Sequence, residues 1–362
     1  MKILFIITSL GMGGAENVLA NLTDGLVQRG CEVKIICLKG EVLVKPQSDQ
    51  VEIVSLNFDG LSNISSILKS IKTIILNDQP DIVHAHMFHA IIVARILRIT
   101  TPIKKLVCTA HSKAFGGKIR ALVYKMTDRW SDINTNVSHE ATENFIKNKI
   151  FNKNNSLTIT NGVDTEKFIF NFADRIAYRT QFKIADNEKV FIAIGRFNEA
   201  KDYPNLINAF NLFRKKSHVE SKLLIVGDGE LRTSIENLIV DTHLSDQIIL
   251  LGIRHDIPQL LNMADTFILS SEWEGLPTVL MEAMSTEKIV ISTDCGGARE
   301  IIDSEDFLVP IKNSEELSRK MLDICQLPEQ YCIQIGKINR QRIVDHYSLD
   351  AMVAQWLKVY KS

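Results

Sequence analysis

Short apolar runs alternate with amphipathic segments along almost the whole chain. Residues 3–8 form a continuous apolar run, which is typical of a parallel strand covered on both faces. Residues 15–28 then place apolar side chains at helical spacing. The same alternation continues to residue 160. It predicts further strands at 33–38, 52–56, 81–86, 105–110, 133–137 and 157–160, and helices at 65–76, 88–97, 118–130 and 139–147.

The alternation starts again after a polar stretch at 165–188. Repeated βα units require right-handed crossovers, and these produce parallel sheets. The sequence therefore predicts an α/β protein with two doubly wound, Rossmann-like domains. In the second half we expect strands at 190–195, 223–227, 248–251, 266–270 and 289–293, and helices that include 203–216, 230–241, 314–326 and 329–346.

The polar stretch also indicates the domain boundary. We expect a first domain over 1–168 and a second over 169–346. The last segment, about 347–362, has apolar residues at helical spacing, and its pattern fits the second domain as well as a return to the first. We assign it to the first domain. Because ligands of doubly wound sheets bind at the carboxyl ends of the strands, the site is expected in a cleft where the two domains face each other.

Composition restricts the function classes. The chain has 362 residues, of which 45% are apolar and 23% charged, as in ordinary globular proteins. A formal net charge of −1 argues against a dedicated nucleic-acid binder. The six cysteines form no CxxC pair, and the apolar run at 3–8 is too short to span a membrane. We therefore expect a cytoplasmic protein with buried thiols.

Charge is unevenly distributed. Residues 1–165 carry a net charge of +5, so the remainder carries −6, and nine basic residues lie between 90 and 130 with one acid, Asp128. This basic 95–129 region has two interpretations: a solvated face, or a surface that lies on the anionic inner face of a membrane. Apolar residues at helical spacing, among them Leu122, Tyr124 and Met126, support the second.

Two loops between a strand and a helix carry candidate phosphate-binding groups. Gly13 and Gly14 follow the first strand, where glycine lets the backbone approach a phosphate near a helix N-terminus. Arg196 and Lys201 follow the first strand of the second half, and two cations at this spacing could hold a diphosphate. The alternatives are a tight turn for the first loop and a solvated basic loop for the second.

Residues 272–284 contain two carboxylates, Glu274 and Glu282, on either side of an expected helix start near Pro277. Carboxylates accept hydrogen bonds from sugar hydroxyls, and a helix N-terminus favours a phosphate. The alternative is an acidic residue that only satisfies the helix dipole. His111 ends a predicted strand beside the basic region, which makes it a further candidate.

These segments, taken in order, resemble the GT-B-fold retaining glycosyltransferases of family four. The resemblance covers nearly the whole chain. Glu274 and Glu282 form the E-x7-E element of that family. The other segments stand in the family's order, namely Gly13-Gly14-Ala15-Glu16, Asp81-Ile-Val-His84-Ala-His86, Asn161-Gly-Val-Asp164, Gly195-Arg196 with Lys201, Val226-Gly227-Asp-Gly-Glu230 and Asp294-Cys-Gly-Gly.

The resemblance implies a role for each matching residue. Arg196 and Lys201 would hold the donor diphosphate and stabilise the charge of the departing nucleotide. Glu274 and His111 would contact the donor sugar, and Glu282 would accept hydrogen bonds from the ribose hydroxyls. The remaining donor-binding residues implied by the resemblance are Gly13, Gly14, Gly227, Arg254, Leu276, Pro277 and Thr278.

The function implied is metal-independent transfer, with retention, of a hexose or N-acetylhexosamine from a nucleoside diphosphate sugar, with UDP-sugar favoured. The acceptor would be a glycan or lipid-linked glycan in envelope polysaccharide biosynthesis, such as capsule or lipopolysaccharide. No DxD motif is present, so no metal cofactor is expected and the cations would neutralise the leaving group. The alternatives are an epimerase or phosphorylase on the same fold, and a non-catalytic sugar-nucleotide binder.

Overall fold

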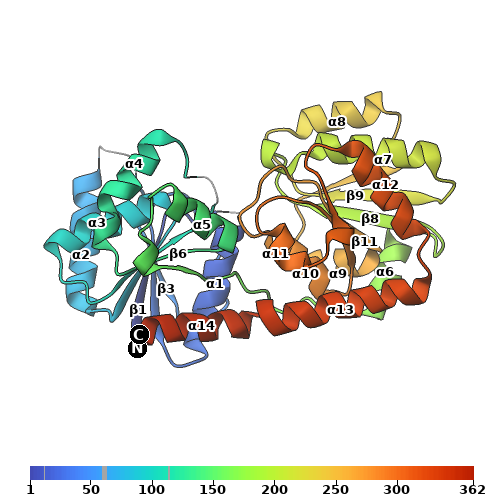
Figure 1. The fold of residues 1–362 in the computed structure, drawn as a ribbon. Helices are drawn as coiled ribbons and strands as arrows, with labels where there is room; N and C mark the ends of the chain where they lie inside the picture. Colours follow the sequence, from blue (N-terminus) through green and yellow to red (C-terminus); the bar gives the residue numbers. More distant parts are fainter. Residues whose placement is uncertain (12, 59–62, 113–114) are drawn as a thin grey trace. The chain divides into compact units, whose positions relative to one another are not determined.

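The protein is described here by a computed structural model that covers residues 1–11, 13–58, 63–112 and 115–362. The chain divides into two compact units (Figure 1). Unit 1 comprises Met1–Gly162 together with Leu349–Ser362, and unit 2 comprises Val163–Ser348. The chain therefore passes from unit 1 to unit 2 after Gly162, a few residues before the boundary expected at 168. The C-terminal helix belongs to unit 1, as predicted. The prediction of two α/β units is confirmed.

Unit 1 contains a sheet of seven parallel strands in the order β3-β2-β1-β4-β5-β6-β7. Their bounds are β1 (Lys2–Ile7), β2 (Glu32–Cys37), β3 (Glu52–Ser55), β4 (Ile82–His86), β5 (Leu106–Ala110), β6 (Ile133–Asn136) and β7 (Ser156–Thr158). The order reverses direction between β1 and β4, which makes this the topological switch point of the sheet.

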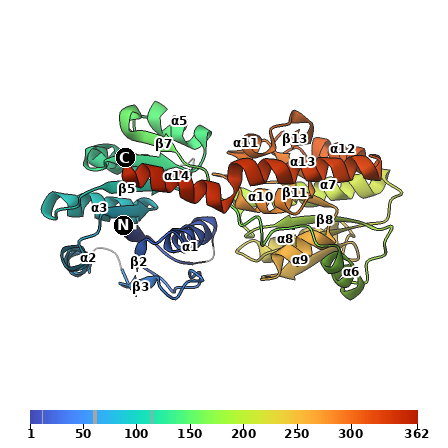
Figure 2. The same cartoon turned by 90° about the horizontal axis from the view of Figure 1, so that it is seen from below.

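The continuous apolar run of β1 is explained by burial on both faces. Ile3, Phe5 and Ile7 pack with apolar residues of α1 (Gly14–Val27) and α14 (Leu349–Lys361), which cover one face (Figure 2). Leu4 and Ile6 point to the opposite face. Four helices cover that opposite face of the sheet: α2 (Ile64–Asp78), α3 (Phe88–Thr100), α4 (Lys118–Thr127) and α5 (His139–Lys147).

Unit 2 contains a sheet of six parallel strands in the order β10-β9-β8-β11-β12-β13. Its order reverses between β8 and β11, so this unit has its own switch point. The bounds are β8 (Lys189–Ile194), β9 (Ser221–Val226), β10 (Ile248–Gly252), β11 (Thr266–Leu269), β12 (Ile289–Thr293) and β13 (Leu308–Val309).

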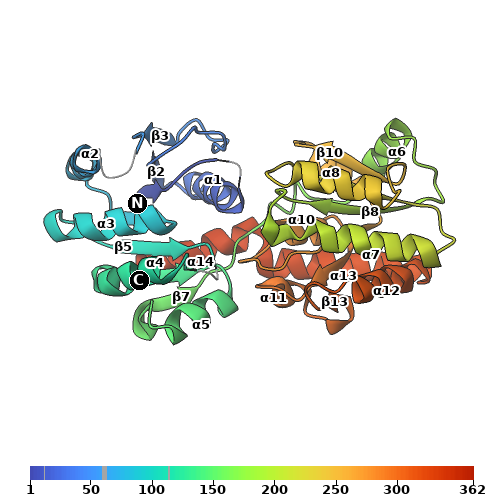
Figure 3. The same ribbon diagram turned by 90° about the horizontal axis from the view of Figure 1, so that it is seen from above.

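Helices cover both faces of the second sheet, as repeated βα units require. The helices α7 (Tyr203–Lys216), α8 (Arg232–Asp241) and α12 (Ser314–Cys325) lie on one face, where Phe210 and Leu317 join the same core (Figure 3). The other helices of this unit are α6 (Phe172–Gln181), α9 (Ile257–Met263), α10 (Thr278–Ser285), α11 (Ala298–Ile302) and α13 (Glu329–Tyr347).

One helix, α6, lies in a segment for which the sequence analysis predicted no helix. Helix α6 occupies the middle of the polar stretch at 165–188. Asn171 caps it by accepting from the backbone N–H groups of Ala173 and Asp174. It is held largely by polar contacts, since Arg175 and Arg179 donate to backbone carbonyls and pair with Asp265. A helix anchored by arginines shows no apolar stripe, which explains why it was missed.

None of the helices in the described part of the chain is both long and apolar enough to cross a membrane.

Candidate functional site

An ion pair lies at the switch point of unit 2. Lys201 follows β8 and Glu274 follows β11, and Lys201 Nζ lies 2.6 Å from Glu274 Oε1. The two side chains are 18% and 16% exposed. The Ser271 hydroxyl also donates to Glu274 Oε1 at 2.6 Å. Two residues 73 positions apart are thus brought together because their strands are neighbours in the sheet.

The loop that carries Lys201 is fixed by local hydrogen bonds. Asn198 caps the short 3-10 turn Glu199–Lys201, and its side chain accepts from the Lys201 backbone N–H at 3.3 Å. The Tyr203 hydroxyl donates to the Gly195 carbonyl at 2.9 Å. Gly227 packs directly on this loop, since a Cβ at that position would lie 2.0 Å from the Gly195 oxygen. Any larger residue at 227 would displace the loop.

Arg196 differs from Lys201 in its surroundings. Its side chain is 68% exposed, and it pairs with Glu230 at 3.2 Å. Such an exposed pair contributes little to stability and can rearrange easily. The two cations predicted as one diphosphate clamp are therefore unequal in this structure: Lys201 is enclosed and Arg196 lies at the surface.

Helix α10 carries the second carboxylate. Leu276 and Pro277 are buried just before it, and Thr278 is its first residue. Glu282 lies one turn further along the helix, where burial raises its pKa to about 7, while Lys167 and Lys201 act in the opposite direction. A carboxyl group with this pKa changes its charge near neutral pH.

Arg254 follows β10 and is anchored inside unit 2. Its Nε donates to Asp256 at 2.8 Å, and the Tyr178 hydroxyl donates to the same carboxylate at 2.8 Å. Hydrogen bonding to Asp256 raises the pKa of the Arg254 guanidinium, so its charge is permanent. The predicted site residues of unit 2 thus all follow strands of this sheet or lie in α10.

In unit 1 the glycine loop follows β1. Gly13 is the N-cap of α1, and Gly14 is the first helical residue. A Cβ on Gly13 would lie 2.5 Å from a carboxylate oxygen of Glu16. Glu16 is buried, which raises its pKa, and it accepts from the Ser9 hydroxyl at 3.3 Å. A side chain at 13 would displace this carboxylate from its place on the loop.

His111 follows β5 and does not lie alone. Its Nε2 is 2.8 Å from Nδ1 of His86, the last residue of β4. Burial lowers the pKa of His111 to about 4. At neutral pH this ring is an uncharged hydrogen-bonding group.

Only some of the basic residues in the region 95–129 lie at the surface. Arg95 is completely buried, so its place in a basic face is wrong. Its guanidinium donates to Ser131, Thr127 and Asn134 and pairs with Asp128. A buried arginine with this many acceptors holds the end of α4 in place. The exposed basic residues on and next to α4 are Lys118, Arg120, Lys125 and Arg129, while Lys104 is exposed at the amino end of the sheet.

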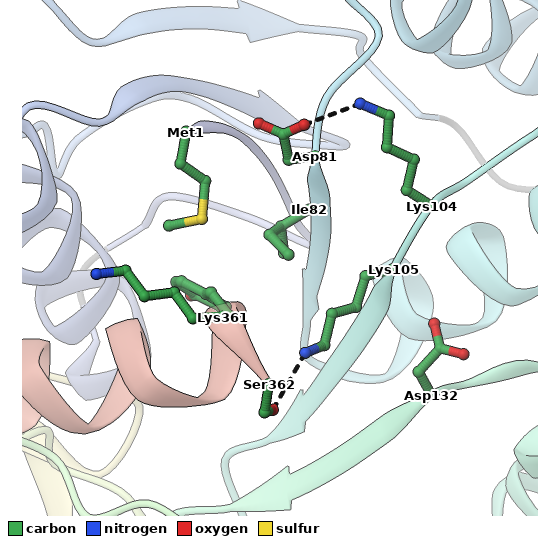
Figure 4. A pocket seen from close by; sticks show the side chains of 9 residues that line it. Met1, Asp81, Ile82, Lys104, Lys105, Asp132, Lys361 and Ser362 are labelled. Atoms are coloured by element: carbon green, nitrogen blue, oxygen red, sulfur yellow. Dashed lines mark hydrogen bonds and ion pairs between the residues drawn. The ribbon is translucent and has the colours of Figure 1, made fainter.

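A separate hollow of about 460 Å³ lies at the opposite, amino end of the first sheet (Figure 4). Its lining includes Lys104, which pairs with Asp81 at 2.8 Å, and Lys105, which donates to Ser362 at 3.3 Å. The charges of Asp81, Lys104 and Lys105 are engaged within unit 1, and the hollow lies away from the strand ends that carry the candidate residues. We do not assign it to the candidate site.

The sequence missed the residues that support the site. Ser271, Asn198 and Tyr203 hold Glu274 and the Lys201 loop. Asn198 has a recognisable signal, because Asn before a short helical turn is a common cap. Ser271 and Tyr203 have none, because their contacts depend on the tertiary structure. In the described residues, no three His, Cys, Asp or Glu side chains converge in a way that would hold a metal ion.

Comparison with known proteins gives the family. The model "Glycosyltransferase Family 4" matches residues 12–167, and the model "Glycosyl transferases group 1" matches 174–342. An uncharacterised glycosyltransferase of Methanocaldococcus jannaschii is 30% identical over 74% of this chain and 69% of its own length. The chain belongs to the group 1 glycosyl transferases. Its two units form the GT-B fold of that family.

Two further relatives are similar over nearly the whole length of this group 1 glycosyl transferase. An Escherichia coli enzyme, UDP-Gal:alpha-D-GlcNAc-diphosphoundecaprenol alpha-1,3-galactosyltransferase, is 25% identical over 93% of this chain and 91% of its own. The crystal structure of Anabaena HepE in complex with UDP has a TM-score of 0.85, 21% identity and full coverage of both chains. The family models and these relatives indicate a glycosyltransferase.

Proposed function

We propose that this glycosyltransferase moves a hexose or N-acetylhexosamine from a UDP-sugar to a glycan or lipid-linked glycan, with retention and without a metal ion. The observation that carries the proposal is the Lys201–Glu274 pair at the switch point of unit 2, 2.6 Å apart and partly enclosed. It supplies a cation for the leaving diphosphate and a carboxylate for the donor sugar at one strand edge.

The need for a cation follows from the reaction. Breaking the donor's glycosidic bond leaves a nucleoside diphosphate whose negative charge has to be stabilised in the transition state. Lys201 Nζ is fixed for this task, and Arg196 can leave Glu230 at low cost because that pair is exposed. These cations take the place that a divalent metal would otherwise fill.

The surroundings of Glu274 favour same-face attack over a covalent intermediate. Its Oε1 accepts from both Lys201 and Ser271. A carboxylate oxygen engaged by an ammonium and a hydroxyl is a weak nucleophile, because both contacts stabilise its charge. We therefore assign Glu274 to binding the donor sugar, and the departing phosphate to assisting the acceptor hydroxyl.

The relatives support the choice of donor and acceptor. The name of the E. coli enzyme describes transfer from UDP-Gal to a diphosphoundecaprenol-linked sugar, and Anabaena HepE was crystallised with UDP. For this chain we propose a UDP-sugar as donor and a lipid-linked glycan of envelope polysaccharide, such as capsule or lipopolysaccharide, as acceptor. The protein would then act at the inner, cytoplasmic face of the cell membrane.

Binding of nucleoside diphosphates tests the proposal directly. A ligand that binds the folded state raises the unfolding midpoint by mass action. We expect UDP, and not GDP, ADP or TDP, to raise the midpoint, with the same shift in EDTA, and transfer from a UDP-sugar to persist in EDTA. Loss of the shift or of transfer in EDTA would overturn metal independence. Stabilisation by another nucleotide alone would overturn the UDP assignment.

Glu282 gives the site a pH dependence. Its pKa is raised to about 7 by burial, so the carboxylate is protonated below that value and ionised above it. If it accepts from the ribose hydroxyls, donor binding strengthens as pH rises from 6 to 8. We expect KM for the UDP-sugar to fall over this range in the wild type, and to be higher but pH-independent in Glu282→Gln. An unchanged KM profile in the variant would contradict the ribose assignment.

Helix α4 presents the surface that we propose to contact the membrane. Ile119, Leu122 and Met126 recur on one face of the helix and are 81%, 57% and 65% exposed. Lys118 and Lys125 flank this stripe and are exposed. Tyr124, which the sequence had grouped with the apolar face, instead points into the core of unit 1. Exposed apolar side chains beside lysines complement the acyl boundary and the anionic headgroups of a bilayer.

Vesicle cosedimentation tests this surface. We expect the protein to bind vesicles with anionic lipid more strongly than neutral ones. The Lys118→Glu/Lys125→Glu variant should lose roughly tenfold or more in affinity, because each basic residue near the surface contributes about 1 kcal/mol. The Ile119→Ser/Leu122→Ser/Met126→Ser variant should also lose binding. Val240→Ser, at a position on α8 that is 61% exposed, serves as the control. Equal binding of all variants would contradict the assignment.

A further inference from the structure

A pair of histidines lies at the switch point of unit 1. His86 ends β4, the neighbour of β1, and His111 follows β5 directly. His86 Nδ1 and His111 Nε2 are 2.8 Å apart, and the ring planes are inclined by 27°. The family motif aligns both residues with strand ends, but it gives no reason for the two rings to contact each other. The contact itself is the observation that needs an explanation.

The hydrogen bond couples the tautomers of the two rings. Burial lowers the pKa of His111 to about 4 and that of His86 well below its usual range, so both are neutral at pH 7. A neutral imidazole carries one N–H and one lone pair. Either His86 Nδ1–H donates and His111 carries its own proton on Nδ1, or His111 Nε2–H donates and His86 carries its proton on Nε2. One proton position therefore fixes the other.

Both outer nitrogens of the pair are buried, so in either arrangement one N–H has no acceptor in the ligand-free chain. Neither His86 Nε2 nor His111 Nδ1 has a hydrogen-bond partner within the described part of the chain. His86 is 1% exposed, and its ring lies beside Phe5 and His84, with centroids 5.6 Å and 4.0 Å away. His84 cannot serve as its partner, because the His84 nitrogens contact Tyr360 and Thr109, both at 2.7 Å.

A buried N–H without an acceptor is rarely tolerated in proteins. A substrate could bring an acceptor to His111, which is partly exposed, but not to His86, which is 1% exposed, so His86 Nε2 should hold the lone pair. His86 Nδ1–H then donates to His111 Nε2, and the remaining N–H of the pair is His111 Nδ1–H. His111 is the less buried residue of the two, although its Nδ1 is itself covered in the ligand-free chain, so a substrate has to displace that cover to accept from it.

We propose that His86 is a positioning residue that holds His111 as the Nδ1–H tautomer, so that His111 donates a hydrogen bond to a hydroxyl oxygen of the sugar substrate. This inference rests on the proposed function, in which His111 contacts the donor sugar. His86 itself does not contact the substrate. No proton is transferred, because the pair only fixes which nitrogen of His111 carries its hydrogen.

Nitrogen NMR of the ligand-free protein tests the tautomer without any assay of activity. Long-range proton–nitrogen spectra of protein labelled with ¹⁵N-histidine distinguish protonated from unprotonated ring nitrogens. We expect His111 to be protonated on Nδ1 in the wild type. In His86→Phe, which keeps a ring but loses both nitrogens, His111 should shift toward the Nε2–H form. A wild-type His111 protonated on Nε2 would overturn the proposal.

The matched control is His84→Phe. It changes a buried histidine of the same strand whose ring nitrogens hydrogen-bond to Tyr360 and Thr109, so the His111 nitrogen signals should stay as in the wild type. If His86→Phe does not fold, His86→Gln replaces it, because its amide lies one bond further from the backbone than Nδ1. Equal shifts of His111 in the His84 and His86 variants would reduce the effect to packing and contradict the proposal.

Kinetics then connect the tautomer to transfer. Loss of orientation at a group that contacts the substrate typically costs roughly 10- to 100-fold, and we expect a fall of this size in kcat for His86→Phe with little change in KM for the donor. His86→Asn, whose amide can reach the Nδ1 position, should recover most of the loss. Full activity of His86→Phe would overturn the proposal. If the wild type is inactive toward every UDP-sugar, the proposed function is contradicted. The NMR experiment then still tests whether His86 sets the tautomer of His111.

Discussion

Replacing Lys201 with alanine is expected to lower kcat/KM for the UDP-sugar by roughly 10²–10³-fold, the range for removing one fixed group that stabilises transition-state charge. Lys201 Nζ is positioned by Glu274 at 2.6 Å and by a capped turn at its backbone. It therefore needs no reorganisation when charge develops on the diphosphate. Because that charge is greatest in the transition state, most of the loss should appear in kcat and a smaller part in KM.

The matched control for Lys201→Ala is Lys215→Ala. Lys215 is an exposed lysine near the end of α7 in the same unit, so this variant should retain wild-type rates. Arg196→Ala should give an intermediate loss, since that side chain is exposed and must first leave Glu230. Circular dichroism and the unfolding midpoint establish that each variant is folded. A Lys201→Ala enzyme within a few-fold of the wild type would show that the leaving group is stabilised elsewhere.

The fold could be predicted because its strands have a strong local signal. The apolar run at 3–8 is buried on both faces of the sheet, and each βα unit repeats that pattern. Helix α6 could not be predicted in this way. Its stability depends on Arg175 and Arg179, which bond to Asp265 and to the distant carbonyl of Met263. Polar anchors of this kind have no period in the sequence, so only the folded chain reveals them.

The candidate site could be predicted as a set of residues, but not as an arrangement. Motif order indicated Lys201 and Glu274 separately, while their contact depends on β8 and β11 being neighbours in the sheet. Charge counting likewise placed Arg95 on a basic face, although its hydrogen bonds bury it completely. A sequence shows which charges are present, and the structure shows which of them already have partners.

The same distinction applies to the histidines. Taken singly, a histidine at a strand end is more often structural than functional, and no role was predicted for His86 from the sequence. Its proximity to His111 gives His86 a functional interpretation. When two neutral rings share a hydrogen bond, the tautomer of one ring determines the tautomer of the other. The two histidines meet because β4 pairs with β5, and no local sequence pattern predicts that pairing.

Replacing Glu274 with alanine is expected to lower transfer at least as much as Lys201→Ala, because the carboxylate has two tasks. It positions the Lys201 ammonium, and we propose that it also binds the donor sugar. Glu274→Gln is the sharper variant. The amide keeps an oxygen acceptor for Ser271 and Lys201 but loses the charge, so it separates the ionic contribution from the packing of the side chain.

A double-mutant cycle separates the two tasks of Glu274. If Glu274 acts only by positioning Lys201, the Lys201→Ala/Glu274→Ala double variant will be no slower than Lys201→Ala alone. If Glu274 also binds the sugar, the double variant will be slower than either single variant, yet faster than the product of the two losses predicts. We expect this second outcome, with a coupling free energy of about 0.5–3 kcal/mol, as is usual for residues in direct contact. Full additivity would show that the 2.6 Å contact does not persist in the transition state. A double variant equal to Lys201→Ala would show that Glu274 does not bind the sugar. The measured coupling therefore decides whether Lys201 and Glu274 bind the two groups that the breaking glycosidic bond joins, the diphosphate and the sugar.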